Sequence, residues 1–495
     1  MRTLAVVLPV VGIILCAGCK RNRAPDSPAM PWGTSVGFVG GASVLSIFVD
    51  VPDMDSVAVR FDWGDGAMSD WSTWTYRGDT LKLGHQWAEA GTFEVRAQAK
   101  SGSGKSSAWS AAHAVAITGA RIRVYGRAGY DFAQSAALTA DGGLIVVGAT
   151  ALSGSPLDSI WLLRTDGSGD TLWTRTYGPN GSGDAVGSSV AQTRDGGFIV
   201  VGWGAAYLHG ESDLLLIKTD AGGDTVWTRQ LDLPGSQSGS CVQQTRDNGY
   251  IIVGTNRTSQ NGDGDVWLVK TNENGDTSWT KSFGGPGQQD GNSVEQTSDS
   301  GYIVLGTTWN HNGMHSQIML TKTDASGNEL WTRTFGNGHR EWATAVRQTS
   351  DGGYVLTGNT EPSSLGGGAL LLKTDGDGNL VWQKLLNGSG GWLGNSVEPT
   401  SDGGYIIAGY TYSCAGAQTG AWLAKTDAVG EVIWDAGFGR VSYNDGVAAF
   451  EAPGGGYLLA GSTCPDSATN SDIWVIKTDA LGAAERRAGR WGMGD

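Results

Sequence analysis

A ten-residue unit that recurs along the last three quarters of the chain constrains its fold more than any other feature. The unit begins with Lys-Thr-Asp, Lys-Thr-Asn or Arg-Thr-Asp and ends with Trp. Its copies are Arg164–Trp173, Lys218–Trp227, Lys270–Trp279, Lys322–Trp331, Lys373–Trp382 and Lys425–Trp434, and Lys477 begins a seventh copy that lacks the Trp. Repeats of this kind are typical of proteins in which one small unit stacks on the next.

The repeat has a period of about 52 residues, which is the distance from Thr297 to Thr349. Each period contains four strand-sized segments, separated by turns of Gly, Asn and Asp such as Asp247-Asn248-Gly249. The two middle segments are continuous apolar runs, as expected for strands covered on both faces, and the two outer segments alternate. Seven repeats of four antiparallel strands predict an all-β fold with a seven-bladed β-propeller over residues 120–482.

The two ends of the repeat region predict how the propeller closes. The seventh copy has no fourth strand after Ile473–Lys477, but the missing strand has a counterpart at the other end, because Arg121–Gly126 aligns with Trp173–Gly178. We expect this N-terminal strand to complete the last blade. Closure of this kind removes the exposed sheet edges that an open array would leave, so it favours a propeller over a solenoid.

Residues 32–118 form a separate module rich in short strand-like runs, which predict a small β-sandwich. The runs are Val44–Val49, Val57–Phe61 and Thr92–Ala97. The module closely resembles the PKD domain in Phe61-Asp62-Trp63-Gly64-Asp65-Gly66, His85-Gln86-Trp87 and Gly91-Thr92-Phe93-Glu94-Val95. This resemblance implies an extracellular spacer or interaction module, with Trp63 and Trp87 in the core. The propeller repeats resemble those of secreted bacterial surface proteins.

The N-terminus predicts export. Met1-Arg2 and the apolar run Leu4–Leu15 are typical of a secretory signal, here residues 1–18, and the run is too short to span a bilayer. Ala17-Gly18-Cys19 resembles the lipobox of bacterial lipoproteins, which implies lipidation of Cys19 and membrane contact only through that anchor. Ordinary cleavage and free secretion are the alternative. We expect residues 19–31 to be a tether and residues 483–495 a C-terminal tail.

Charge and missing motifs exclude several classes of function. The net charge of -15 argues against a nucleic-acid partner, because binding phosphates needs a basic surface. The sequence contains no Gly-x-Ser-x-Gly, no His-Glu-x-x-His and no phosphate-binding Gly-x-x-x-x-Gly-Lys-Ser/Thr motif. We therefore predict a monomeric protein that is not an enzyme and needs no cofactor. Calcium is the one candidate ion, because several acidic residues recur in the repeats.

Candidate ligand-binding residues lie where the repeats differ. In a four-stranded blade the first and third turns lie on one side of the disc, the turn face, and the second turns and crossovers lie on the other, the loop face. The loop face carries exposed aromatic and polar residues that suit stacking on sugar rings or gripping a protein. They are Trp203, Tyr207, His209, Trp309, His311, His315, His339, Arg340, Glu341, Trp342, Trp392, Tyr410 and Tyr412. Covering the blade edges is the alternative role.

Acidic residues recur just before the innermost strand of several blades. They are Asp131, Asp184, Asp290, Glu341 and Asp445. If they converge at the mouth of the central channel, their carboxylates suit a hard cation such as calcium, although capping of turns explains the pattern equally well.

Cys414 and Cys464 lie in corresponding loops of consecutive repeats, so in an exported protein they are candidates for a disulfide bond. The Trp that ends each repeat unit predicts packing between blades.

These features together predict an exported, lipid-anchored surface protein that acts as a non-catalytic binding or scaffolding module for a glycan or a protein. The alternative hypothesis is a propeller-type polysaccharide hydrolase or lyase that uses acids at the channel mouth.

Overall fold

The computed structural model divides the chain into two compact units, Met1–Gly119 and Ala120–Asp495. It describes residues 24–482 except 34–35, 39–42, 50–55, 77, 86, 88–90, 119–120, 128, 153–157, 179–183, 206–211, 232–234, 258–263, 310–314, 337, 364–365, 387–390, 413–418, 439–443, 454 and 465–470. The signal segment, Cys19 and the C-terminal tail lie outside the described residues. Among the described residues, no helix has the length and apolar character needed to cross a membrane.

The first unit is a sandwich of two sheets, with strand orders β1-β3-β6 and β2-β8-β7-β4-β5. The strands are β1 (Trp32–Gly33), β2 (Val36–Phe38), β3 (Ser43–Phe48), β4 (Ser56–Asp62), β5 (Thr75–Tyr76), β6 (Thr80–His85), β7 (Gly91–Lys100) and β8 (His113–Thr118). Trp63 and Trp87 are buried between the sheets, as the PKD resemblance implies. His85 stacks on Trp63 at 4.7 Å and lies 2.7 Å from Asp65, so its contacts are structural.

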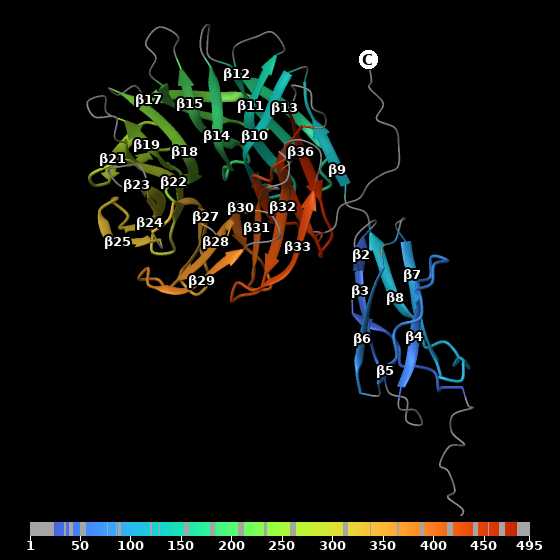
Figure 1. Ribbon diagram of the computed structural model, residues 1–495. Coiled ribbons are helices and arrows are strands. Elements are labelled where there is room, and N and C mark those ends of the chain that lie inside the picture. The colour runs from blue at the N-terminus through green and yellow to red at the C-terminus, as the bar shows by residue number, and fades with distance from the viewer. Residues whose placement is uncertain are drawn as a thin grey trace, which may run out of the picture. The chain divides into compact units, whose positions relative to one another are not determined.

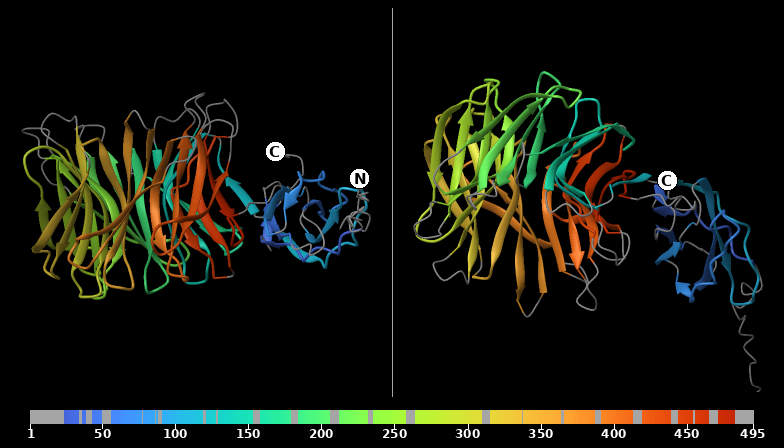
Figure 2. Two further views of the ribbon diagram at one scale, coloured as in Figure 1. Left: turned by 60° about the horizontal axis from the view of Figure 1, so that its bottom comes forward. Right: turned by 90° about the horizontal axis from the view of Figure 1, so that it is seen from above.

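The second unit is a ring of four-stranded antiparallel sheets (Figure 1), seen from other directions in Figure 2. The described strands form seven such sheets, here called blades. In six of them chain order runs outward from the centre of the ring, and in the seventh a strand from the start of the unit is outermost. The innermost strands are β10 (Gly129–Leu138), β14 (Ala185–Gln192), β18 (Ser236–Gln244), β22 (Gln289–Gln296), β26 (Glu341–Gln348), β30 (Gly391–Pro399) and β34 (Ala448–Glu451). The second strands are β11 (Leu144–Leu152), β15 (Phe198–Ala205), β19 (Tyr250–Arg257), β23 (Tyr302–Trp309), β27 (Tyr354–Ser363), β31 (Tyr405–Tyr412) and β35 (Tyr457–Thr463).

The outer half of each blade contains the recurring Lys-Thr-Asp unit. The third strands are β12 (Asp158–Thr165), β16 (Ser212–Thr219), β20 (Gly264–Thr271), β24 (Ser316–Thr323), β28 (Gly366–Thr374), β32 (Thr419–Thr426) and β36 (Asp472–Lys477). The outermost strands are β13 (Thr171–Tyr177), β17 (Thr225–Leu231), β21 (Thr277–Phe283), β25 (Glu329–Phe335), β29 (Leu380–Leu386), β33 (Val432–Phe438) and β9 (Arg121–Tyr125). The all-β prediction is confirmed, and so is closure by the N-terminal strand, because β9 pairs with β36.

The repeated Trp packs between neighbouring blades, as predicted. Trp279, for example, contacts Tyr302 of the next blade with ring centroids 5.9 Å apart. The same ring covers Gly327, a residue with φ of +77° in the third turn of the next blade, so closely that a Cβ there would lie 2.6 Å from it. The Trp–Gly contacts are Trp173–Gly223, Trp227–Gly275, Trp279–Gly327, Trp331–Gly378, Trp382–Gly430 and Trp434–Gly482. At six of the seven junctions, one blade therefore packs on the next through a position that only glycine fits.

The repeated Lys ties two turns of its own blade together. Lys322 is buried, and its Nζ donates hydrogen bonds to the Thr323 carbonyl at 2.8 Å and to the Asp299 carboxylate. Asp299 in turn accepts a hydrogen bond from Thr297 and lies in the first turn of the blade. Equivalent pairs are Arg164–Asp141, Lys218–Asp195, Lys270–Asp247, Lys373–Asp351 and Lys425–Asp402. The Lys-Thr-Asp signature is thus explained by its role in the turn face.

The Trp–Gly contact predicts a difference between two glycine substitutions. Gly327→Ala adds a methyl group against the Trp279 ring and a side chain at positive φ, so we expect unfolding free energy to fall by about 2 to 4 kcal/mol. Gly352 has a similar φ of +82° but open space around its Cβ position, so Gly352→Ala is the control and should cost about 1 kcal/mol. Urea unfolding of both variants measures the difference. Equal losses would contradict a role for the contact.

The Lys–Asp pairs predict loss of stability in acid. Hydrogen bonds from Lys373 and then Thr349 lower the pKa of Asp351 to about 2. For Asp299 and Asp402 burial opposes ionisation, but hydrogen bonds from Thr and Lys outweigh it and again lower the pKa to about 2. Because these folded-state values lie below that of an unfolded Asp, their contribution is complete above about pH 4 and is lost as the pH falls toward 2.

Thermal unfolding between pH 6 and pH 2 tests this expectation. The variant Asp299→Asn, Asp351→Asn, Asp402→Asn should be less stable than the natural protein at pH 6, yet lose less stability between pH 4 and pH 2. If the variant loses as much stability between pH 4 and pH 2 as the natural protein does, groups other than these three Asp residues cause the acid sensitivity.

Candidate ligand-binding site

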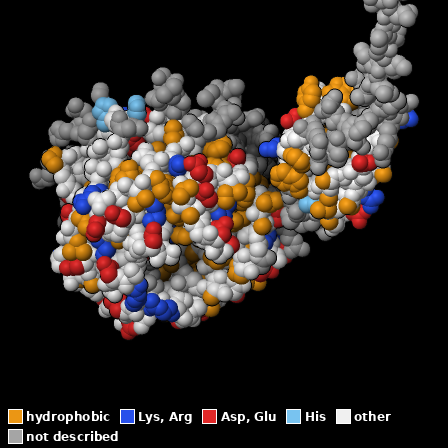
Figure 3. All heavy atoms as spheres, turned by 90° about the horizontal axis from the view of Figure 1, so that it is seen from below, with side chains coloured by type: hydrophobic (Ala, Val, Ile, Leu, Met, Phe, Trp, Pro, Cys, Tyr) orange, Lys and Arg blue, Asp and Glu red, His pale blue; other side chains and the backbone are white. Residues whose placement is uncertain are grey.

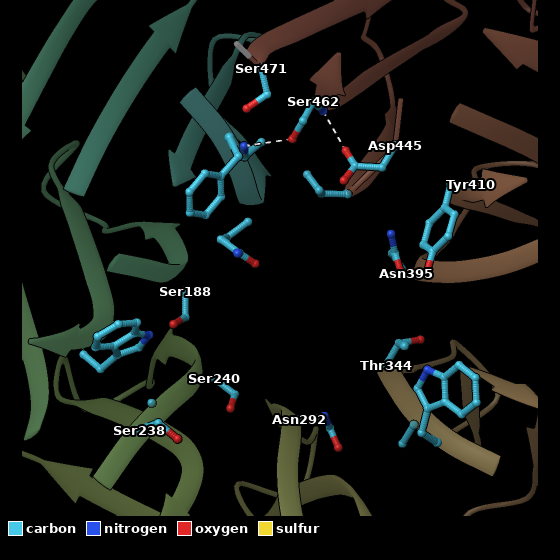
Figure 4. Close-up of a pocket in the computed structure, with 18 residues that line it drawn as sticks. Ser188, Ser238, Ser240, Asn292, Thr344, Asn395, Tyr410, Asp445, Ser462 and Ser471 are labelled. Carbon is cyan, nitrogen blue, oxygen red and sulfur yellow. Dashed lines mark hydrogen bonds between the residues drawn. The ribbon is translucent and has the colours of Figure 1, made fainter. Parts of the chain in front are cut away.

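The centre of the propeller holds a cavity of about 800 Å³ that 18 residues line. The lining comes from the innermost strands, the loop-face ends of the second strands and residues just before β34 and β36, and its side chains surround an open centre (Figure 4). Most are uncharged and polar. No Lys, Arg or His is among them, and Asp445 is the one carboxylate of the described lining.

A β-bulge supplies one lining side chain from each of six blades. The pairing of innermost and second strands shifts register once in every one of these blades, which leaves one extra residue on the innermost strand. Such a residue has no partner in the pairing of the two strands, and the bulge changes the direction in which its side chain points. The extra residues are Gln134, Ser188, Ser240, Asn292, Thr344 and Asn395, and Val447 lines the cavity from the seventh blade. We call these seven residues the channel ring.

Three of the predicted ligand-binding aromatics meet at the same cavity. Trp203 comes from β15, Trp342 from β26 and Tyr410 from β31, and all three side chains are partly exposed. They lie far apart in the sequence but at the same end of their blades. Trp203 and Tyr410 lie near the ends of second strands and Trp342 near the start of an innermost strand, and innermost and second strands run antiparallel. The channel therefore combines aromatic rings with the polar channel ring.

Other predicted residues gather at the rim of the loop face around Ser316. Ser316 pairs with Trp309 on one side and forms a parallel bridge with Arg340 on the other. His315 and His339 precede these two bridge partners and are exposed, and the described histidines of the propeller lie together in Figure 3. The polar groups of this rim are engaged with acids: Trp309 Nε1 donates to Asp290 at 3.0 Å, and Arg340 pairs with Glu361 at 3.1 Å.

Trp392 is not among the residues that line the cavity. Trp392 packs on Trp422 with ring centroids 4.6 Å apart, so its contact is with the blade core. Tyr207, His209 and His311 lie outside the described residues, as does the side chain of Tyr412. Cys414 is also outside them, so its disulfide with Cys464 stays a prediction.

The structure places the five predicted acids at separate points. Asp445 lines the cavity, and its Oδ1 accepts a hydrogen bond from the Ser462 amide at 2.6 Å. Asp290 pairs with Arg257 at 2.9 Å, and buried Asp131 accepts a hydrogen bond from the Arg127 amide. Asp184 lies before β14 and Glu341 at the start of β26, and neither is among the lining residues. Within the described part of the chain, no group of three or more His, Cys, Asp or Glu residues is placed to hold a metal ion.

Sequence reasoning missed the channel ring, although a signal for it is present. A Gly or Ala precedes every ring member, and it is buried against the neighbouring blade. At Gly239, for example, a Cβ would lie 2.3 Å from Val201. In six of the seven repeats a small residue followed by a variable polar one, at the same place, marks the bulge.

Solved structures resemble parts of this chain at a low level, and no protein-family model or curated protein matches it. A PKD domain of an M14-like peptidase from a Thermoplasmatales archaeon is 28% identical over 19% of this chain and 98% of that one, with a TM-score of 0.17. An acylaminoacyl peptidase from Pyrococcus horikoshii is 9% identical, over 74% of this chain and 53% of its own, with a TM-score of 0.42. A putative exo-beta-1,3-galactanase from Bifidobacterium bifidum is 14% identical, over 51% and 91%, with a TM-score of 0.31. The chain thus spans about half the length of the Pyrococcus enzyme, and similarity at this level carries no functional argument.

The different surroundings of two tryptophans predict different effects of their removal. Trp392→Ala takes away a ring packed on Trp422, so we expect the unfolding free energy to fall by about 2 to 4 kcal/mol. Trp342→Ala removes a ring that faces the cavity and should cost less than about 1.5 kcal/mol. Chemical denaturation compares the two variants. A larger loss from Trp342→Ala would make that residue structural.

Proposed function

We propose that this protein is an exported binding module without catalytic activity, and that its propeller takes up a glycan at the loop-face mouth of the channel. The observation that supports this most is the cavity, in which Trp203, Trp342 and Tyr410 accompany uncharged polar side chains. Aromatic rings offer a flat apolar face to the C–H groups of a sugar ring, and hydroxyl and amide groups match its hydroxyls. A volume of about 800 Å³ is in the range of small-ligand sites rather than of protein interfaces.

The proposed location follows from the N-terminal sequence. The signal segment of residues 1–18 supports export, and Cys19 supports a lipid anchor. In that arrangement the PKD-like unit is the spacer between the membrane and the propeller. Labelling with a radioactive fatty acid tests the anchor: a Cys19→Ala variant should lose the label that the natural chain carries.

The competing hypothesis is a polysaccharide hydrolase or lyase. Hydrolysis of a glycosidic bond ordinarily needs two carboxyl groups that flank it. The described lining of the cavity provides only Asp445, whose Oδ1 is already engaged by the Ser462 amide. The binding hypothesis therefore fits the geometry better. Release of new reducing ends or unsaturated products from a bound polysaccharide would favour the enzyme.

A glycan array probed with the chain lacking its signal segment tests the binding proposal. We expect at least one glycan to bind, and Trp203→Ala with Trp342→Ala to weaken that binding at least tenfold, because the stacking faces are lost. Trp74→Ala is the matched control, since Trp74 is a 50% exposed tryptophan of the other unit. Binding that is lost equally in the control, or an array without any binder, would overturn the proposal.

A further inference from the structure

We infer that the channel ring is the part of the site that selects the ligand, and that it selects an uncharged, hydroxyl-rich glycan. This inference rests on the proposed function and narrows it. Its starting point is that in six of the seven blades the fold delivers one side chain to the channel by the same device, a bulge, while the identity of that side chain varies from blade to blade. The conserved geometry of the repeat positions the ring, and the variable residue sets its chemistry.

Hydrogen bonds within a blade or to the next blade orient three ring members and leave defined groups for a ligand. Asn292 Oδ1 accepts from Thr307 at 3.2 Å, so its amide N–H groups are available as donors. Asn395 Nδ2 donates to the Gly446 carbonyl at 3.0 Å, so its carbonyl oxygen is available as an acceptor. The Thr344 hydroxyl donates to the Thr357 carbonyl at 3.1 Å, so the lone pairs of its oxygen are available as acceptors.

This side of the ring thus offers donors from Asn292 and acceptors from Thr344 and Asn395, all three of which are seen in Figure 4. A sugar hydroxyl both donates and accepts, so a chain of hydroxyls satisfies such a mixed set where a ligand with acceptors alone does not. Ser188 and Ser240, from the two preceding blades, add two more hydroxyl groups.

The charge of the lining excludes anionic glycans. The described lining has no cation, and the nearby Arg257 and Arg340 are already paired with Asp290 and Glu361. A carboxylate or sulfate that entered the channel would lose hydration and meet no opposite charge, while facing Asp445 and a protein of net charge -15. An uncharged ligand does not carry this cost.

Two sets of variants test the inference on the full chain without its signal segment. The first is Asn292→Ala, Thr344→Ala, Asn395→Ala, with Asn274→Ala in a third turn of the propeller as the control. The second is Ser240→Lys, which adds a cation to a partly exposed ring position where the channel is open. Calorimetric titration with neutral oligosaccharides, and with oligosaccharides that carry uronate or sulfate groups, measures each affinity, and thermal unfolding checks that each variant is folded.

We expect the natural chain to bind neutral oligosaccharides only, the triple variant to bind them about 10- to 100-fold more weakly, and the control to bind them as before. Ser240→Lys should admit an anionic oligosaccharide that the natural chain rejects, and this gain does not depend on the triple variant folding. Binding of anionic glycans alone, or an unchanged affinity in a folded triple variant, would overturn the inference but leave the proposed function standing. Failure of every glycan would overturn the proposed function itself.

Discussion

The contact between the tryptophan of one blade and the third-turn glycine of the next is the interaction on which the propeller depends. Each blade is a four-stranded sheet with apolar middle strands, so it must bury both faces against neighbours. The Trp ring provides much of that cover at the outer edge, and the glycine at positive φ lets the next turn approach it closely. A repeated pair of this kind sets how closely the neighbouring blades approach each other at six of the seven junctions.

At the closing junction of the ring, the seventh blade packs against the first without a Trp. Here Gly169 faces Val475 and Arg123 instead of a ring, and Arg123 pairs with Asp170 at 2.6 Å. Tyr125 of the same strand also donates a hydrogen bond to the Gly169 carbonyl. The N-terminal strand therefore joins the last blade to the first with polar links, and the ring closes although the seventh copy of the repeat is incomplete.

The repeat separates stability from binding. Buried Lys residues, their Asp partners and the Trp–Gly contacts occupy the turn face and the outer strands, where the sequence varies little from copy to copy. The channel ring and the aromatic mouth lie at the other end of the innermost strands, where the copies differ. Substitution in the ring leaves the Trp–Gly contacts between blades in place, so the scaffold tolerates variation in the residues that face the channel.

The sequence alone determined the period, the four strands of each blade, the strand that closes the ring and the packing role of the repeated Trp, because these follow from local patterns of apolar, turn and aromatic residues. It also identified Trp203, Trp342 and Tyr410 as candidates, since they interrupt an otherwise regular repeat. Only the tertiary structure showed that these three share one cavity while Trp392 packs on Trp422, and that the predicted acids do not meet. It alone revealed the channel ring, because a bulge displaces a side chain by one residue, and the two-residue period of a strand gives no warning of that shift.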